Sequence, residues 1–173
     1  NKLCLLRNQG RINRGSFIHP AIGYNFRMTD IQASLGLSQL AKLDSIIFNK
    51  QKIFDAYQSE SKGLQGVRLL GASKNSNHVP FRAVIIAEKA LELMNYLETE
   101  GVQTRSFFYP LHKQPCFTEL VVPNHEHFND LNFPNANFGY EHGICLPIHS
   151  SLTLADVNYI SNKIIAFYSK INY

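Results

Sequence analysis

A long helix with a marked start is the strongest structural signal in this sequence. Thr29 and Gln32 have the spacing of a capping box, in which each side chain caps the backbone N–H group of the other residue. Apolar residues then recur at about helical spacing as far as Tyr57, and Gly63 is a natural helix stop. We therefore expect a helix over residues 29–62 with one bend or break along it.

Short apolar runs alternate with helical stretches after this helix. We expect strands at VRLL, VPFRAVII, VQTRSFF and ICLPIH, and a final helix whose first turn is capped by Thr153. A further helix, EKALELMNYLETEG, has Leu91, Met94 and Leu97 on the side expected to pack. Three or four strands covered by helices make an α+β domain.

Composition excludes several functional classes. Apolar residues make up 45% of the 173 residues and charged residues 17%, so the chain can bury a core. No apolar run approaches the roughly 18–20 residues that cross a bilayer, so no membrane span is expected. The net charge is only +4. Arg7, Arg11 and Arg14 do not form the dense basic stripe that nucleic-acid binding requires, so we expect no nucleic-acid partner.

The cysteines and histidines indicate neither a disulfide framework nor a metal site. The three cysteines are odd in number and far apart, which favours reduced thiols in a cytoplasmic protein. The HEH stretch at residues 125–127 places two histidines on one face of a strand, but no third ligand follows at a suitable spacing. We therefore expect no metal.

The stretch GYNFR, which precedes the long helix, is a candidate anion site. Gly23 permits close backbone approaches, Asn25 offers an amide, and the Arg27 guanidinium suits phosphate or carboxylate. The free N–H groups of the helix that follows also favour an anion. The residues alone allow a plainer interpretation equally well, with Asn25 in a turn and Arg27 in a surface ion pair.

A second candidate is TRSFFYPLH, residues 104–112, which places Arg105, Tyr109 and His112 at a strand end and in the following loop. Loops at strand ends often carry binding residues, and Tyr and His can hydrogen-bond a sugar or move protons. The pattern by itself favours an aromatic edge packed on the core with one surface histidine.

Three blocks of the sequence resemble successive signatures of one family. They are HPAIGYNFRMTDIQASLGLSQLAKLD, VQTRSFFYPLHKQPCF and ICLPIHSSLTLADVNYISNKI. In order and spacing they are similar to the DegT/DnrJ/EryC1/StrS family of pyridoxal-phosphate-dependent sugar aminotransferases. Within the family they most resemble enzymes of the perosamine synthase type, which aminate C4 of nucleotide-linked 4-keto-6-deoxyhexoses.

The resemblance implies a fold and a division of the chain. The family has the type I aminotransferase fold, with a large cofactor domain and a smaller C-terminal domain. Residues 1–28 would then be the tail end of the large domain with an active-site loop, 29–62 the linking helix, and 63–173 the C-terminal α+β domain.

The resemblance also implies site residues and partners. Asn25 would reach across a homodimer to the cofactor phosphate of the partner subunit, and Arg27 would lie near the same phosphate. Tyr109 and His112, with Arg105 at the start of their loop, would line the pocket for the nucleotide sugar, and glutamate would be the amino donor.

The family's Schiff-base lysine is expected upstream of this sequence, because none of the ten lysines lies in the corresponding motif. We therefore expect a C-terminal portion with no catalytic residue of its own and no transamination by the chain alone. The alternative is a non-catalytic binding module, either a remnant or one half of a split enzyme that pairs with a separate large-domain chain. A phosphate- or nucleic-acid-binding domain outside the family would require all three matches to be chance.

Overall fold

The computed structural model describes residues 2–12, 15, 17–64, 66–116 and 130–171. The chain divides into two compact units, Asn1–Asp44 and Ser45–Tyr173, and each is described by itself. None of the helices among the described residues is both long and apolar enough to cross a membrane.

The described residues of the first unit include two helices. Helix α1 (Lys2–Arg7) is followed by Gly10, which has a φ of 76° and donates its N–H to the Leu5 carbonyl, so it ends the helix. Helix α2 (Asp30–Leu40) begins at Thr29, and the expected capping box is confirmed: the Thr29 hydroxyl accepts from the Gln32 N–H, and the Gln32 side chain accepts from the Thr29 N–H. Neither helix has a buried residue.

The helix expected over residues 29–62, with one bend or break along it, is broken once into two helices. After α2 the chain turns at residues 41–42, and α3 (Leu43–Glu60) begins. Gly63 follows with a φ of 83° and is the expected stop.

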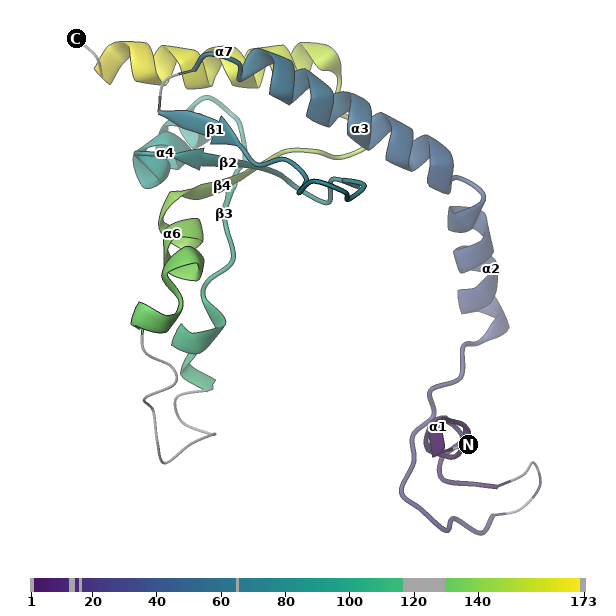
Figure 1. Ribbon diagram of the computed structural model, residues 1–173. Coiled ribbons are helices and arrows are strands. Elements are labelled where there is room, and N and C mark those ends of the chain that lie inside the picture. Colours follow the sequence, from purple (N-terminus) through teal and green to yellow (C-terminus); the bar gives the residue numbers. More distant parts are fainter. Residues whose placement is uncertain (1, 13–14, 16, 65, 117–129, 172–173) are drawn as a thin grey trace. The chain divides into compact units, whose positions relative to one another are not determined.

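The second unit is a four-stranded antiparallel sheet with helices, which confirms the α+β class (Figure 1). The strand order is β1-β2-β4-β3. After α3, the elements among its described residues are β1 (Val67–Leu69), β2 (Ala83–Ala87), α4 (Ala90–Thr99), β3 (Arg105–Ser106), η1 (Leu111–Lys113), η3 (Asp130–Asn132), α6 (Pro134–His142), β4 (Gly143–Leu146) and α7 (Leu154–Ile171).

The core lies on one face of this sheet, under α3, α4 and α7. Strand alternation decides which side chains enter it. Ala83, Ile85 and Ala87 of β2 belong to the core cluster, whereas the intervening Val84 does not. The helical residues of the hydrophobic core cluster are Ile53, Phe54, Tyr57, Ala90, Leu93, Leu97, Val157, Ile160 and Ile164.

The packed face of α4 differs from the expected one. Leu97 is fully buried and Met94 is partly buried, but Leu91 is 71% exposed and Leu93 is buried in its place. At the start of α7 the expected cap at Thr153 is confirmed: the Thr153 hydroxyl accepts from the Asp156 N–H, and the Thr153 N–H and hydroxyl both donate to the Asp156 carboxylate.

Candidate functional site

The GYNFR turn is held by its backbone against the end of α1. Tyr24 N–H donates to the Leu6 carbonyl (2.6 Å) and Phe26 N–H donates to the Arg7 carbonyl (3.1 Å). Gly23 is required here, because a Cβ at this position would lie 2.1 Å from the Gly10 nitrogen. The close approach expected of Gly23 is thus confirmed.

This backbone arrangement leaves the polar side chains of the turn free. Asn25 and Arg27 are both exposed, and neither side chain forms a hydrogen bond or ion pair with the described part of the chain. The surface ion pair considered for Arg27 is therefore not formed with any described residue. The neighbouring rings of Tyr24 and Phe26 stack with their centroids 5.0 Å apart.

Arg27 lines a hollow of about 790 Å³ in the first unit, which we call the N-terminal hollow. Lys2, Arg7 and Arg11 also line it, and its lining among the described residues holds no carboxylate. The Nε atom of Arg11 is buried and has no hydrogen-bond partner within the described part of the chain. A buried guanidinium nitrogen without a partner is costly, so four cations and this donor make the hollow suited to an anion.

In the second candidate stretch, residues 104–112, the structure separates Arg105 from Tyr109 and His112. Tyr109 and His112 each pack against another ring: the Tyr109 ring lies edge-on to Tyr140, and the His112 ring stacks on Phe133 at 4.6 Å. Tyr109 is 41% exposed, whereas His112 is 7% exposed. Tyr109 is therefore the member of the pair that can meet a ligand directly.

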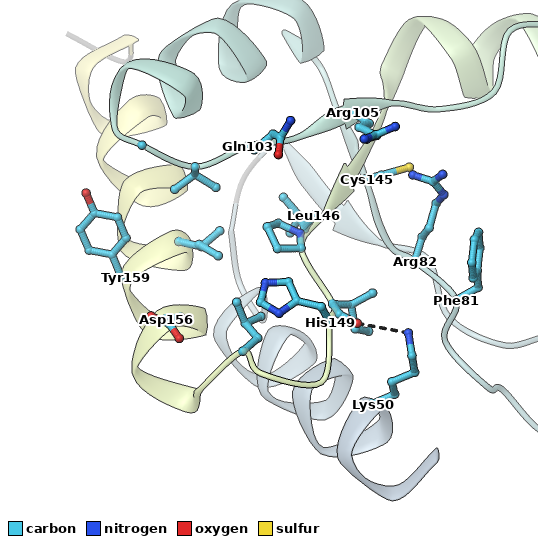
Figure 2. A pocket seen from close by; sticks show the side chains of 16 residues that line it. Lys50, Phe81, Arg82, Gln103, Arg105, Cys145, Leu146, His149, Asp156 and Tyr159 are labelled. Atoms are coloured by element: carbon cyan, nitrogen blue, oxygen red, sulfur yellow. Dashed lines mark hydrogen bonds between the residues drawn. The ribbon is translucent and has the colours of Figure 1, made fainter. Parts of the chain in front are cut away.

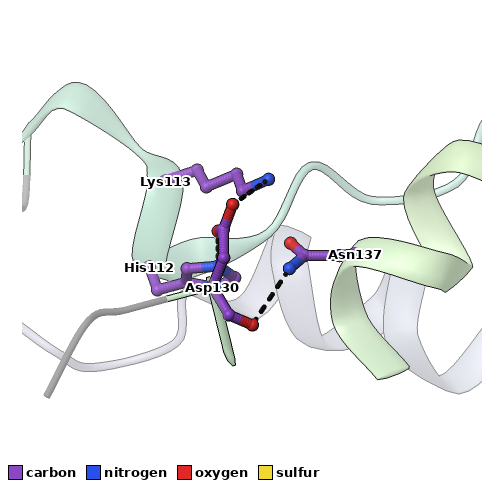
Figure 3. A network of polar contacts seen from close by, with 4 residues as sticks. All are labelled: His112, Lys113, Asp130 and Asn137. Carbon is purple, nitrogen blue, oxygen red and sulfur yellow. Dashed lines mark hydrogen bonds and ion pairs between the residues drawn. The ribbon is translucent and has the colours of Figure 1, made fainter. Parts of the chain in front are cut away.

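A polar network fixes the position of His112 (Figure 3). Its Nε2 atom lies 2.9 Å from Asp130 Oδ1, and the Lys113 ammonium lies 3.1 Å from the other oxygen of Asp130. The bond from His112, and secondarily that from Lys113, lowers the pKa of the Asp130 carboxyl. The Asn137 amide donates to the Asp130 backbone carbonyl and ties the network to α6.

Arg105 lies in another place. It stands on β3 opposite Cys145 of β4 and lines a hollow of about 680 Å³, which we call the β4 hollow, whose lining includes neither Tyr109 nor His112 (Figure 2). Lys50, Arg82 and His149 also line the β4 hollow. The sequence alone did not predict these three residues, because they lie on α3, before β2 and after β4, which only the tertiary fold brings together.

No metal centre is found in the described ranges, where no three His, Cys, Asp or Glu side chains are grouped to hold an ion. The HEH stretch at residues 125–127 lies outside those ranges. Cys4, Cys116 and Cys145 are free cysteines.

Comparison with known proteins identifies the family. The chain belongs to the DegT/DnrJ/EryC1/StrS aminotransferase family, whose sequence pattern it matches over residues 1–165. Proteins of this family are pyridoxal-phosphate-dependent aminotransferases. Structurally, the chain is similar to a Streptococcus pneumoniae protein, Spr1654, described as a sugar aminotransferase and solved in its PLP form. The TM-score is 0.84 at 23% identity, over 98% of this chain and 43% of the other.

Two curated relatives show how the length of this chain compares with that of similar proteins. GDP-perosamine synthase of Escherichia coli O157:H7 is 35% identical over 170 residues, covering 96% of this chain and 44% of the relative. GDP-perosamine synthase of Vibrio cholerae is 32% identical over 169 residues, covering 95% and 44%. The chain thus spans less than half the length of these relatives.

The N-terminal hollow fits the phosphate of pyridoxal phosphate. Its cations and the unpartnered Arg11 Nε supply the charge and donors that a phosphate requires. Arg27 would hold the phosphate directly, and Asn25, on the same turn, offers an amide donor.

Proposed function

We propose that this chain is the C-terminal part of a pyridoxal-phosphate-dependent aminotransferase. The whole protein would replace the C4 keto oxygen of a nucleotide-linked 4-keto-6-deoxy sugar by an amino group, with glutamate as the donor, for a surface polysaccharide. The support is the similarity to two GDP-perosamine synthases over 96% and 95% of the chain.

The observation that carries the proposal is the set of unpaired donors in the first unit. Asn25 and Arg27 stand on one rigid turn with no partner among the described residues, and Arg27 lines a hollow without a carboxylate. We propose that this turn delivers the Asn25 amide and the Arg27 guanidinium to the cofactor phosphate of the partner subunit in a homodimer. The phosphate anchors the cofactor and neutralises these charges.

The remaining residues take supporting roles in this proposal. Residues 1–28 belong with the large cofactor domain, residues 29–62 link the domains, and residues 63–173 form the small domain. Tyr109 contacts the sugar, and His112, held by Asp130, positions the loop that presents Tyr109. The cofactor supplies the electron sink and carries the amino group, and the lysine that holds it belongs to the large domain.

Binding of pyridoxamine 5′-phosphate to the chain tests the phosphate site. This probe lacks an aldehyde, so it does not react with surface lysines, and pyridoxamine is its phosphate-free control. We expect amide NMR shifts of the turn with the phosphate and none with pyridoxamine. Replacing one charged hydrogen bond costs about 1.5–3 kcal/mol, so Arg27→Gln is expected to weaken binding roughly tenfold or more.

A second arginine substitution is the control for Arg27→Gln. Arg68→Gln removes the same charge from an exposed position on β1 and is expected to leave binding unchanged. Equal shifts with pyridoxamine, or equal weakening by Arg68→Gln, would refute a phosphate site at this turn.

A further inference from the structure

The outer face of the sheet, opposite the hydrophobic core, carries two arginines that line the β4 hollow. Strand alternation defines this face: Ala83 of β2 enters the core, so its neighbours Arg82 and Val84 face outward. Cys145 of β4 is the direct partner of Val84, and Arg105 of β3 is the direct partner of Cys145. Directly paired residues share a face, so Arg82 and Arg105 lie on either side of Cys145 (Figure 2).

Neither guanidinium is paired with a carboxylate. Arg82 and Arg105 form no ion pair within the described part of the chain. The Nε atom of Arg82 is buried and has no hydrogen-bond partner among the described residues. The neighbouring Cys145 supplies no negative charge, because burial raises the pKa of its thiol, although Arg82 acts in the opposite direction. A buried N–H group without an acceptor costs free energy, which a bound anion would recover.

The one carboxylate in the described lining of the β4 hollow lies away from these arginines. Asp156 belongs to α7, which covers the core face of the sheet, and Figure 2 shows it apart from both guanidinium groups. Its oxygens accept hydrogen bonds from the N–H and the hydroxyl of Thr153. The part of the hollow on the outer face therefore keeps its positive charge.

Two aromatic rings hold Arg82 in position. Its guanidinium lies 5.2 Å from the centre of the Phe81 ring and 5.4 Å from that of Phe108. These contacts restrict the side chain, so less conformational entropy is lost when it binds an anion. The Phe81 ring also lines the hollow and is 74% exposed, so it offers a free aromatic surface beside the arginines.

Two arginines on one face match the charge and geometry of a phosphate group. A guanidinium can donate two N–H groups to two phosphate oxygens, and two guanidinium groups balance the charge of a phosphate dianion. Val84 and Cys145, which lie between the arginines, are only 9% and 5% exposed. Limited access of water to this floor strengthens the attraction between the arginines and an anion.

We propose that Arg82 and Arg105 form a phosphate-binding site on the outer face of the sheet. The phosphate is either a free ion or the phosphate of a nucleotide, whose base would stack on the exposed ring of Phe81. The site lies wholly in the second unit and uses neither Asn25 nor Arg27. It therefore stands or falls independently of the cofactor phosphate site.

Titration of the full chain with inorganic phosphate at pH 8 and low ionic strength tests the site. The shifts would be followed by NMR at the Ser106 and Cys145 amides, in a background of Arg27→Gln, which weakens the phosphate site proposed for the first unit. We expect saturable shifts with phosphate and weaker binding of acetate, which carries one charge. No saturable shift at these amides, or acetate binding as tight as that of phosphate, would overturn the proposal.

Guanosine 5′-monophosphate and guanosine distinguish the two sources of phosphate. Equal binding of the nucleotide and inorganic phosphate would show that the arginines bind the phosphate group alone. Nucleotide binding about fivefold tighter or more, with the gain lost in Phe81→Leu, would show that a base stacks as well. Either result supports a phosphate site, whereas guanosine binding as tightly as its monophosphate would refute it.

Three arginine substitutions locate the site. Arg82→Gln and Arg105→Gln are each expected to weaken phosphate binding roughly tenfold or more. Arg105 is exposed on an edge strand, so its variant should fold even if Arg82→Gln does not. Arg68 pairs with Ile86 and shares the outer face but does not line the hollow, so Arg68→Gln should have no effect. Equal weakening by Arg68→Gln would show only general charge attraction and would refute the assignment.

Discussion

Gly23 determines whether the turn that carries Asn25 and Arg27 can form. A methyl group at this position would collide with the backbone of Gln9 and Gly10, which cannot move as a flexible side chain could. We predict that Gly23→Ala destabilises the first unit by about 2 kcal/mol, as overpacking typically does. Loss of hydrogen-exchange protection at the Tyr24 amide, which donates to the Leu6 carbonyl, is the expected readout.

Gly36 provides the matched control. It lies in α2, and a Cβ there would meet nothing within 4 Å. Gly36→Ala should stabilise the helix by up to about 1 kcal/mol through helix propensity. An undisturbed Tyr24 amide in Gly23→Ala would contradict the close backbone crossing.

Tyr57 makes the second unit sensitive to high pH. Its hydroxyl donates to the Pro147 carbonyl at 3.0 Å, and burial, followed by the charge of Asp156, raises its pKa above the ordinary value of 10.0. The folded state therefore holds this proton more tightly than the unfolded state, so stability is complete below about pH 10 and falls as the pH rises above it.

We predict that Tyr57→Phe reduces this alkaline loss of stability. The variant should lose about 1 kcal/mol near neutral pH, because one hydrogen bond is removed. Above pH 10 its free energy of unfolding should fall less steeply than that of the unmodified chain. Denaturant unfolding followed by circular dichroism at pH 8 and pH 11 measures both effects, and an unchanged slope would contradict the role of Tyr57.

At the residue level, roles that depend on neighbouring residues in the chain could be predicted from the sequence. Contacts between residues that are far apart in the chain could not. The roles of Gly23 and Thr29 follow from neighbouring residues. The contact of His112 with Asp130 joins residues 18 apart, and the shared face of Arg82 and Arg105 depends on β4 lying between β2 and β3. No local pattern contains that information.

The capping threonines of α2 and α7 are expected to stabilise different units of the chain. Thr153→Ala removes the hydroxyl that caps the Asp156 N–H at the start of α7, and should cost the second unit about 1 kcal/mol. Thr29→Ala should weaken α2 by a similar amount while leaving the second unit unchanged. Chemical denaturation of the second unit, measured by circular dichroism and NMR, distinguishes them, and equal destabilisation of that unit by both would contradict the division after Asp44.

For the helices, apolar periodicity predicts some bounds and buried faces correctly and others not. The starts of α2 and α7 could be predicted because each has a capping threonine. The break between Leu40 and Leu43 lacks Gly or Pro, so no local signal marks it. In α4 two adjacent stripes are apolar, and packing against α7 and the sheet, rather than spacing, selects Leu93 over Leu91.

Across the whole molecule, the first unit exposes apolar surface that a partner would cover. On α2, Ile31 is 75% exposed and Leu35, one turn later, is 62% exposed. We predict that the chain self-associates through this face and that the double substitution Ile31→Gln and Leu35→Gln reduces association. Sedimentation velocity over a concentration series measures it. Leu91→Gln, at an equally exposed position on α4, should have no effect, and equal effects would indicate non-specific aggregation.

The most direct measurement of the central claim is amino transfer by the protein encoded by the full reading frame that contains this chain. It would be incubated with glutamate and, in turn, GDP-, dTDP- and UDP-linked 4-keto-6-deoxy sugars, and the amino sugar would be detected by mass spectrometry. We predict an amino sugar from one of them, with the rate lowered roughly tenfold or more by Arg27→Gln and unchanged by Arg68→Gln. A folded, cofactor-bound protein that forms none of the three amino sugars would contradict the account.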